Sequence, residues 1–192
     1  MESPTNKDLP IYFWKPEGEV GFLGQWWPSP FKWEHGNEKY TYANAEQELM
    51  WNTSRYMMHR KALLFAGPAH PVTHDIRTGW KIHPRELRNL GRKIPRFDDE
   101  VWEMHRLEIV IEGNYLKFSQ NEDLKRRLLG TGERELVEAS PQDRVWGIGF
   151  GAKSAGENRE RWGLNLLGKA LMEVRRRIQE DELQASRGSK RK

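Results

Sequence analysis

The 192-residue sequence contains no cysteine. A disulfide framework, a thiolate metal site and a cysteine nucleophile are therefore excluded. No apolar run approaches the roughly 18 residues that a membrane-spanning helix needs. The opening segment, MESPTNKDLP, lacks the basic and apolar regions of a signal peptide. These absences predict a soluble intracellular protein, cytoplasmic or nuclear, that does not associate with membranes.

The sequence also has little net charge. It carries 32 Lys and Arg against 28 Asp and Glu, which gives +4 and a pI near 9.3. Because four basic residues and no acidic residue follow Glu182, residues 1–182 carry 28 charges of each sign. A balanced body does not predict a broad electrostatic footprint on duplex DNA. Residues 183–192 are expected to form a flexible basic tail, suited to a weak, salt-sensitive contact or a short localisation signal.

Aliphatic residues are scarce, whereas tryptophan is abundant. Only 36% of residues are hydrophobic, yet nine are Trp. An indole fills a large core volume and brings one N–H that needs a partner, but it can equally line a pocket for a planar ligand. Composition leaves both uses open.

Periodicity and capping residues predict an α+β fold, a helix-predominant single domain with a few short strands. Strands are expected at 11–14 and 135–140, a turn at 34–39, a connection at 68–83 and irregular chain at 147–163. Helices are expected at 45–66, from Pro84 to a stop at Gly91, from Asp98, between Asn121 and Gly130, and along the apolar stripe that begins at Leu164. The domain is expected to span 11–182, preceded by a flexible N-terminus at 1–10.

Two motifs give only weak indications of a binding site, one for zinc and one for phosphate. His70 and His74 have the spacing of a helical zinc pair, but they lie in the expected connection and lack the glutamate of a metalloprotease. The loop Gly147-Ile-Gly149-Phe-Gly151 has neither the spacing of a dinucleotide-binding fingerprint nor the Lys-Ser/Thr of a P-loop. Its glycines allow either a close backbone approach to a ligand or an irregular turn.

A third group combines carboxylates with indoles. Glu46 lies in the first turn of the helix expected at 45–66, and Asp143 precedes Trp146 and Gly147 at the edge of the glycine loop. Trp26 and Trp27 lie in an early proline-flanked loop. Carboxylates beside indoles can bind an aromatic ring and stabilise positive charge on an adjacent sugar. A helix-terminal acid and a turn aspartate explain the same two carboxylates equally well.

At these residues the sequence resembles the NADAR (YbiA-like) family. The matching segments occur in order over nearly the whole chain. They include FLGQWWPSPF (22–31), YMMHRKALLF (56–65), FDDEVW (97–102), GNYLKFSQN (113–121), LLGTGERELVEASPQDRVWGIGF (128–150) and WGLNLLGKALMEVR (162–175).

The resemblance implies a YbiA-like fold and an N-glycosidase that cleaves ribose from an exocyclic amine without a cofactor or metal. Two substrates are associated with the family: ADP-ribosylated guanine, in nucleotides or nucleic acid, and ribosylaminopyrimidine intermediates of riboflavin biosynthesis. Removal of ADP-ribose from guanine is the function that we expect. A non-catalytic module that binds ADP-ribose or NAD is the alternative of another class.

The resemblance also implies site residues. Glu46 matches the family's catalytic glutamate, and Asp143 matches its site aspartate, expected to hydrogen-bond or transfer a proton. The residues expected to bind substrate are Trp26, Arg92, Trp102, Trp146, Gly147, Gly149 and Asn165. Among these, Arg92 and the amides of the glycine loop are candidates for contacting phosphate.

One departure from the family pattern leaves the catalytic glutamate open. The family continues from Glu-Gln directly into Tyr-Met-Met, but ELMWNTSR (48–55) intervenes here. Eight residues turn a helix by about 80° net, so one continuous helix cannot preserve the usual relation of Glu46 to Lys61. Glu48 is the alternative to Glu46. Schiff-base chemistry at Lys15 or Lys39 also stays open, although solvated lysines are the ordinary expectation.

Overall fold

The computed structural model describes residues 9–36, 38–42, 52–78 and 84–189. Its fold is α+β with helix predominating and a few short strands, which confirms the predicted fold class. The chain divides into two compact units, one formed by residues 1–24 and 121–192 and the other by residues 25–120. The boundaries predicted at 10/11 and 182/183 stay predictions.

The discontinuous unit contains a parallel pair of strands, β1 (Ile11–Phe13) and β4 (Leu136–Glu138). Ile11 lies opposite Leu136, and Phe13 lies opposite Glu138. The side chains of Leu136 and of its neighbour Val137 are both fully buried, so the strand is covered on both faces. Both strands lie within the ranges that the sequence predicts.

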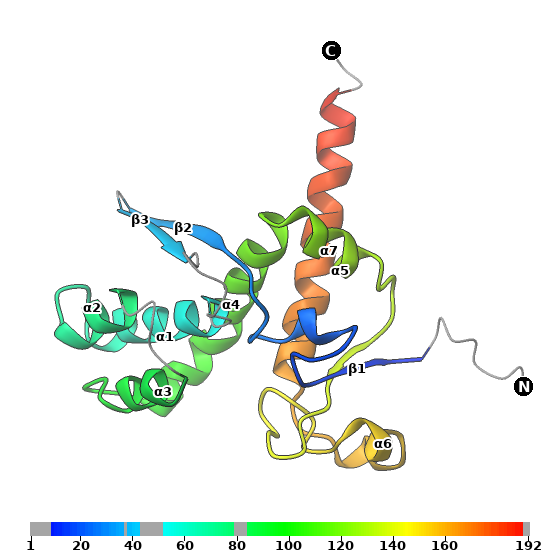
Figure 1. Cartoon of the computed structure of the whole chain (residues 1–192), viewed down its shortest axis with the longest axis horizontal. Helices are drawn as coiled ribbons and strands as arrows, with labels where there is room; N and C mark the ends of the chain where they lie inside the picture. Colours follow the sequence, from blue (N-terminus) through cyan, green and yellow to red (C-terminus); the bar gives the residue numbers. More distant parts are fainter. Residues whose placement is uncertain (1–8, 37, 43–51, 79–83, 190–192) are drawn as a thin grey trace, which may run out of the picture. The chain divides into compact units, whose positions relative to one another are not determined.

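A long helix, α7 (Leu166–Ser189), packs against β4 and against α5 (Glu122–Leu129) (Figure 1). Its buried face consists of Leu167, Ala170, Leu171, Val174 and Ile178. This spacing of three and four residues confirms the stripe predicted for the last helix. Leu164 is the exception, because it precedes the helix and is 47% exposed.

Short helical segments complete this unit. They are η1 (Gly21–Leu23), α6 (Ala152–Ala155) and η2 (Gly156–Arg161). The expectation that 147–163 is irregular is therefore wrong for its second half. The Trp162 indole N–H donates to the carbonyl of Ala155 at 2.8 Å, which ties the end of η2 to α6.

The continuous unit begins with an antiparallel hairpin, β2 (Phe31–His35) and β3 (Glu38–Tyr42). The turn expected at 34–39 is narrower than predicted, because residues 34, 35, 38 and 39 belong to the paired strands. Trp33 stacks on Tyr40 across the hairpin with ring centroids 5.1 Å apart. Cross-strand aromatic pairs of this kind stabilise a short hairpin.

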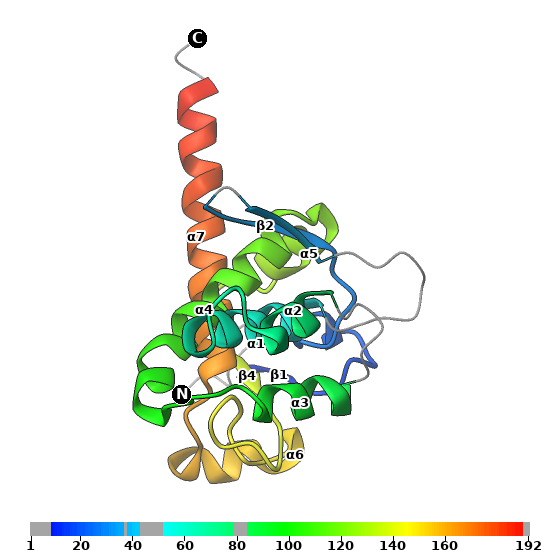
Figure 2. The ribbon, with the colours of Figure 1, turned by 90° about the vertical axis from the view of Figure 1, so that its left-hand side faces the viewer.

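Four helices follow: α1 (Asn52–Phe65), α2 (Pro71–Thr78), α3 (Pro84–Arg92) and α4 (Asp99–Ser119). In Figure 2, α2 and α3 lie beside α1, in agreement with the contacts of the three helices. Gly113 lets α4 approach α1, since a Cβ there would lie 2.7 Å from the ring of Tyr56. The side chain of Asp98 accepts the N–H of Val101 at 3.0 Å, which confirms the predicted start of α4.

Two helix boundaries differ from the sequence prediction. The expected connection at 68–83 contains α2, so that prediction is wrong. Pro71 occupies the first helical position, where a missing N–H costs nothing, and the ring Nδ1 of His70 accepts the N–H of Val72 at 3.2 Å. In the same way, α3 continues through Gly91 to Arg92 instead of stopping at the glycine.

The helices that the structure describes include none with the length and apolarity to cross a membrane.

Removal of residues 185–192 is expected to leave stability unchanged. Helix α7 continues to Ser189, but the side chains of residues 181–188 are exposed, and Ile178 is the last buried residue of the stripe. The free energy of unfolding in urea should change by less than about 0.5 kcal/mol. A loss well above that value would show that the end of α7 packs on the protein.

Candidate functional site

The segment that follows β4 forms a tightly held loop. The amide of Ile148 donates to the carbonyl of Glu138 at 3.0 Å, so the loop returns alongside the strand. Further backbone bonds of 2.8–3.2 Å join residues 144–148 to residues 163–167. At Gly147 a Cβ would lie 2.7 Å from the carbonyl oxygen of Glu138, and at Gly163 it would lie 2.2 Å from that of Arg144. These glycines therefore permit close backbone packing.

Asp143 organises the turn of this loop. Its Oδ1 accepts the backbone N–H groups of Val145 and Trp146, each at 2.8 Å. The residue is half-buried, and its Oδ2 makes no hydrogen bond with the described part of the chain. Asp143 is therefore a turn residue that uses one carboxylate oxygen to hold the loop. Its role as the site aspartate stays a prediction.

Glu138, at the end of β4, is a second carboxyl group in this loop. Its Oε2 is buried and has no hydrogen-bond partner among the described residues. Burial, reinforced by the negative charge of Asp143, raises the pKa of Glu138 to about 7. At neutral pH this group therefore exists in both protonation states.

Asn165 joins the start of α7 to β4. Its Oδ1 accepts the N–H of Glu138 and its Nδ2 donates to the carbonyl of Leu136, both at 3.0 Å. The residue is 5% exposed and has a φ of +49°, which asparagine tolerates better than most residues. This side chain fixes the backbone of Glu138; its expected contact with substrate stays a prediction.

Five predicted residues thus belong to one loop and its support in the discontinuous unit: Asp143, Trp146, Gly147, Gly149 and Asn165. The half-buried Trp146 donates its amide to Asp143, and its carbonyl accepts the N–H of Leu167 at 3.1 Å. Gly149 has a φ of +78° and closely approaches the side chain of Arg144. Phosphate binding by the amides of this loop stays a prediction.

The other predicted residues belong to the continuous unit. Trp102 is half-buried and packs against two clusters of the core, so it contributes to packing as well as to any pocket. The ammonium of Lys61 lies 5.2 Å from its ring centroid, and burial lowers the pKa of that lysine. Arg92 is exposed at the end of α3, and Trp26 is 43% exposed.

Both candidate catalytic glutamates, Glu46 and Glu48, lie outside the described residues, as does the capping pattern of residues 44–47. The lysines considered for Schiff-base chemistry are described. Lys39 pairs with Glu34 at 2.9 Å, with both side chains largely exposed, and the exposed Lys15 lies 5.2 Å from the ring centroid of Trp14.

His70 and His74 do not lie on one helix as a helical zinc-binding pair would. His70 precedes α2 and accepts a backbone N–H through Nδ1, whereas His74 lies within the helix, 3.7 Å from the carboxylate of Asp75. Within the described ranges, no three His, Asp or Glu side chains are grouped as ligands for a metal ion.

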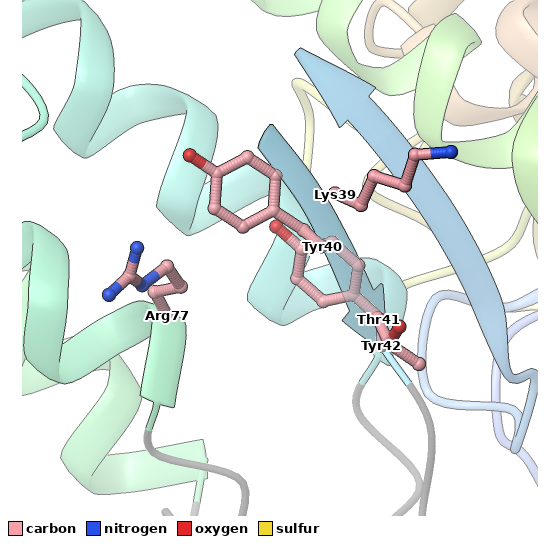
Figure 3. A pocket seen from close by; sticks show the side chains of 5 residues that line it. All are labelled: Lys39, Tyr40, Thr41, Tyr42 and Arg77. Atoms are coloured by element: carbon pink, nitrogen blue, oxygen red, sulfur yellow. The ribbon is translucent and has the colours of Figure 1, made fainter. Parts of the chain in front are cut away.

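A cavity of about 360 Å³ opens between β3 and α2, lined by Lys39, Tyr40, Thr41, Tyr42 and Arg77 (Figure 3). Lys39, considered for Schiff-base chemistry, lines it, but no other described residue predicted from the sequence as catalytic or substrate-binding does. Sequence reasoning therefore missed this cavity, because α2 itself was expected to be a connection.

Sequence reasoning also missed Glu138, although the sequence contains a signal for it. In a strand at 135–140, residues 136, 138 and 140 share a face, so Glu138 lies on the face of the fully buried Leu136. An acid on an apolar strand face is a candidate for a perturbed pKa.

Comparisons with known proteins identify the family and agree with the fold. The sequence matches the NADAR domain model over residues 12–179. It is 42% identical over 169 residues to N-glycosidase R617 of Acanthamoeba polyphaga mimivirus, covering 86% of this chain and 92% of that protein. It is 37% identical over 123 residues to riboflavin biosynthesis protein PYRR, chloroplastic, of Arabidopsis thaliana, covering 60% of this chain and 19% of that protein.

The fold resembles the NMR structure of the E. coli protein YbiA. The TM-score is 0.63 at 23% sequence identity, over 92% of this chain and 88% of that one. The family match extends over most of the sequence, including the loop of Asp143 and the start of α7. The chain therefore belongs to the NADAR domain family.

Proposed function

We propose that the protein is an N-glycosidase that releases ADP-ribose from modified guanine, in nucleotides or in nucleic acid. Similarity to a protein named N-glycosidase, over most of both chains, supports the reaction class. The observation that carries the chemistry is the pair of carboxyl groups in one loop: Asp143, whose Oδ1 accepts two backbone amides, and Glu138, with a pKa near 7. A carboxyl group with a raised pKa beside a second carboxyl group suits general acid catalysis.

In this reaction, the bond between the ribose anomeric carbon and the exocyclic nitrogen of guanine breaks. Glu138 donates a proton to that nitrogen, so that guanine leaves as a neutral amine. The Asp143 carboxylate stabilises the positive charge that develops on the sugar. Water then adds its oxygen to the anomeric carbon and returns a proton to Glu138, which restores the starting state.

Roles carried over from the family complete the proposal. Glu46 orients the ribose hydroxyl groups or stabilises the sugar cation, and Trp102 and Trp146 contact the base or the ribose. Trp26, Arg92 and Asn165, with the glycine-loop amides, hold the rest of the substrate. No metal or redox cofactor takes part.

A second candidate reaction is hydrolysis of ribosylaminopyrimidine intermediates of riboflavin biosynthesis. It is favoured by the 37% identity to a protein named for riboflavin biosynthesis, although this chain covers only 19% of that protein. The same carboxyl groups serve here, since this substrate is also an N-riboside of an exocyclic amine. A module that binds ADP-ribose without turnover is the remaining alternative.

One assay separates the three functions. The protein is incubated, in chelator, with DNA that carries ADP-ribosylated guanine and, separately, with a ribosylaminopyrimidine phosphate, and the released sugar is quantified. Release of ADP-ribose from DNA supports the proposal, whereas release only from the pyrimidine supports the second reaction. Tight binding of ADP-ribose without release indicates the module. An absolute need for an added divalent ion would contradict the carboxylate mechanism.

The catalytic glutamate is expected to be Glu46 and not Glu48. Glu46→Gln should lower the initial rate of ADP-ribose release by at least about tenfold, because it removes a carboxylate that interacts with the sugar cation. Glu48→Gln makes the same change of charge two positions away and serves as the matched control. The opposite pattern, with only Glu48→Gln impaired, would assign the role to Glu48.

A further inference from the structure

The cavity between β3 and α2 combines an aromatic wall with a cation. Figure 3 shows the side chain of Arg77, from α2, on one side of the cavity and the rings of Tyr40 and Tyr42, from β3, on the other. The guanidinium lies 5.9 Å from the ring centroid of Tyr40. The ammonium of Lys39 points away from these rings and pairs with Glu34. Arg77 is therefore the cation that the cavity presents.

Among the described residues, those around this cavity carry more positive than negative charge. Arg60 is paired with Glu112, but neither Arg55 nor Arg77 forms an ion pair with a carboxylate of the described residues. Arg55 is only 7% exposed, its guanidinium lies 5.2 Å from the ring centroid of Tyr42, and its Nε has no partner among the described atoms. Arg55 does not line the cavity, but its buried charge adds to the positive potential that favours an anion beside Arg77.

His59, which contacts Tyr42, does not supply a negative charge to balance these arginines. The Tyr42 hydroxyl and the Nδ1 of His59 share a hydrogen bond of 2.7 Å, and the Nε2 of His59 is buried without a partner in the described chain. Burial, followed by the charges of Arg77, Arg55 and Arg60, lowers the pKa of His59 to about 4. His59 is therefore neutral at physiological pH. The contribution of the three arginines to its lowered pKa is consistent with a positive potential around the cavity.

We infer that this cavity binds the phosphate group of a small phosphorylated molecule, with the guanidinium of Arg77 as its principal ligand. A planar guanidinium forms two parallel hydrogen bonds to phosphate oxygens, which makes arginine suited to this group. A volume of about 360 Å³ lies at the lower end of the range for small-molecule sites. The site goes beyond the proposed function, because no residue assigned to that reaction is among the described residues that line it.

Binding of three probes by isothermal titration calorimetry tests the inference: inorganic phosphate, inorganic pyrophosphate and ADP-ribose. The protein variants are wild type, Arg77→Ala and Arg77→Lys. Arg126→Ala is the matched control, since it removes the same charge from an exposed arginine that pairs with Asp123 at 3.2 Å in α5. Arg77 is itself exposed, so its replacement should leave the fold intact, as circular dichroism will verify.

Pyrophosphate should bind the wild type and Arg126→Ala equally, and should bind Arg77→Ala at least about tenfold more weakly. Arg77→Lys should give an intermediate affinity, because it retains the charge but not the planar fork. An equal loss of ADP-ribose affinity in Arg77→Ala identifies a nucleotide as the source of the phosphate. If only the inorganic anions respond to Arg77, the source is the free ion.

Unchanged pyrophosphate binding in Arg77→Ala would overturn the inference, as would an equal weakening in Arg126→Ala, which indicates unspecific attraction. Both results leave the proposed reaction untouched, because sugar release is measured separately. Conversely, a protein that binds pyrophosphate through Arg77 but releases no sugar retains this site and loses the proposed activity.

Discussion

Glu138→Gln is expected to lower kcat for ADP-ribose release by about 10²- to 10⁴-fold, the usual contribution of a general acid. The substitution preserves the size of the side chain but removes its exchangeable carboxyl proton. In the wild type, the pH profile of kcat should fall above about pH 7, where Glu138 loses its proton. The residual kcat of the variant should not show this fall above about pH 7. Steady-state rates between pH 5 and pH 9 measure both effects.

Stability distinguishes loss of the acid from damage to the fold. Because burial raises the pKa of Glu138 to about 7, the folded state holds this proton more tightly than the unfolded state does. Stability therefore falls as pH rises from about 4.5 to about 7, and Glu138→Gln removes that loss. The variant should gain stability relative to the wild type at pH 8 but not at pH 4.

The matched control for this experiment is Glu135→Gln. Glu135 lies in the same segment and pairs with Arg159 at 2.8 Å on the surface. The control should retain the rate and the pH profile of the wild type. An unchanged pH profile in Glu138→Gln would remove Glu138 from the mechanism and leave Asp143 as the only carboxyl group of this loop with a proposed role.

Gly168→Ala is expected to lower the free energy of unfolding by about 3 kcal/mol or more. An alanine Cβ at this position of α7 would lie 2.1 Å from the carbonyl oxygen of Leu136 and 2.5 Å from the amide nitrogen of Asn165. The obstacle is strand backbone together with a side chain that is held at both ends, so little can move aside. Helix α7 would have to shift away from β4. Urea denaturation monitored by tryptophan fluorescence measures the loss.

The same helix provides the control. Gly188, near the end of α7, has no heavy atom within 4 Å of an added Cβ. Gly188→Ala should be neutral or slightly stabilising, since alanine favours helix over glycine by about 1 kcal/mol at most. Similar stabilities for the two alanine variants would contradict the close packing of α7 on β4.

The parts of the fold that the sequence predicts are those with local causes. Helix α4 begins where Asp98 caps it, and an aspartate followed by two acidic residues is visible without any tertiary information. The apolar stripe of α7 is equally local. The predicted stripe begins too early, at Leu164, because periodicity does not reveal that Asn165 has a positive φ and that the helix begins only at Leu166.

The features that the sequence did not predict depend on tertiary contacts. Helix α2 was not predicted because proline, histidine and threonine are typical of loops, whereas its Val72 and Ile76 are buried in a cluster with Phe65 of α1. The pKa of Glu138 depends on burial and on Asp143, five positions away across a turn. The resemblance to the family indicated Asp143, but a charge interaction between two carboxyl groups requires the folded loop.

The pairing of β1 with β4 has a consequence for how the chain folds during synthesis. Residues 25–120 form their own compact unit and lie, in sequence, between the two strands. This middle segment can therefore fold while β1 still has no partner. The first strand is made early, yet it can pair only after the ribosome has released Leu136–Glu138. Pairing β1 with β4 closes a long loop, which costs conformational entropy. When residues 25–120 are already folded, the flexible part of that loop is shorter and the cost is smaller.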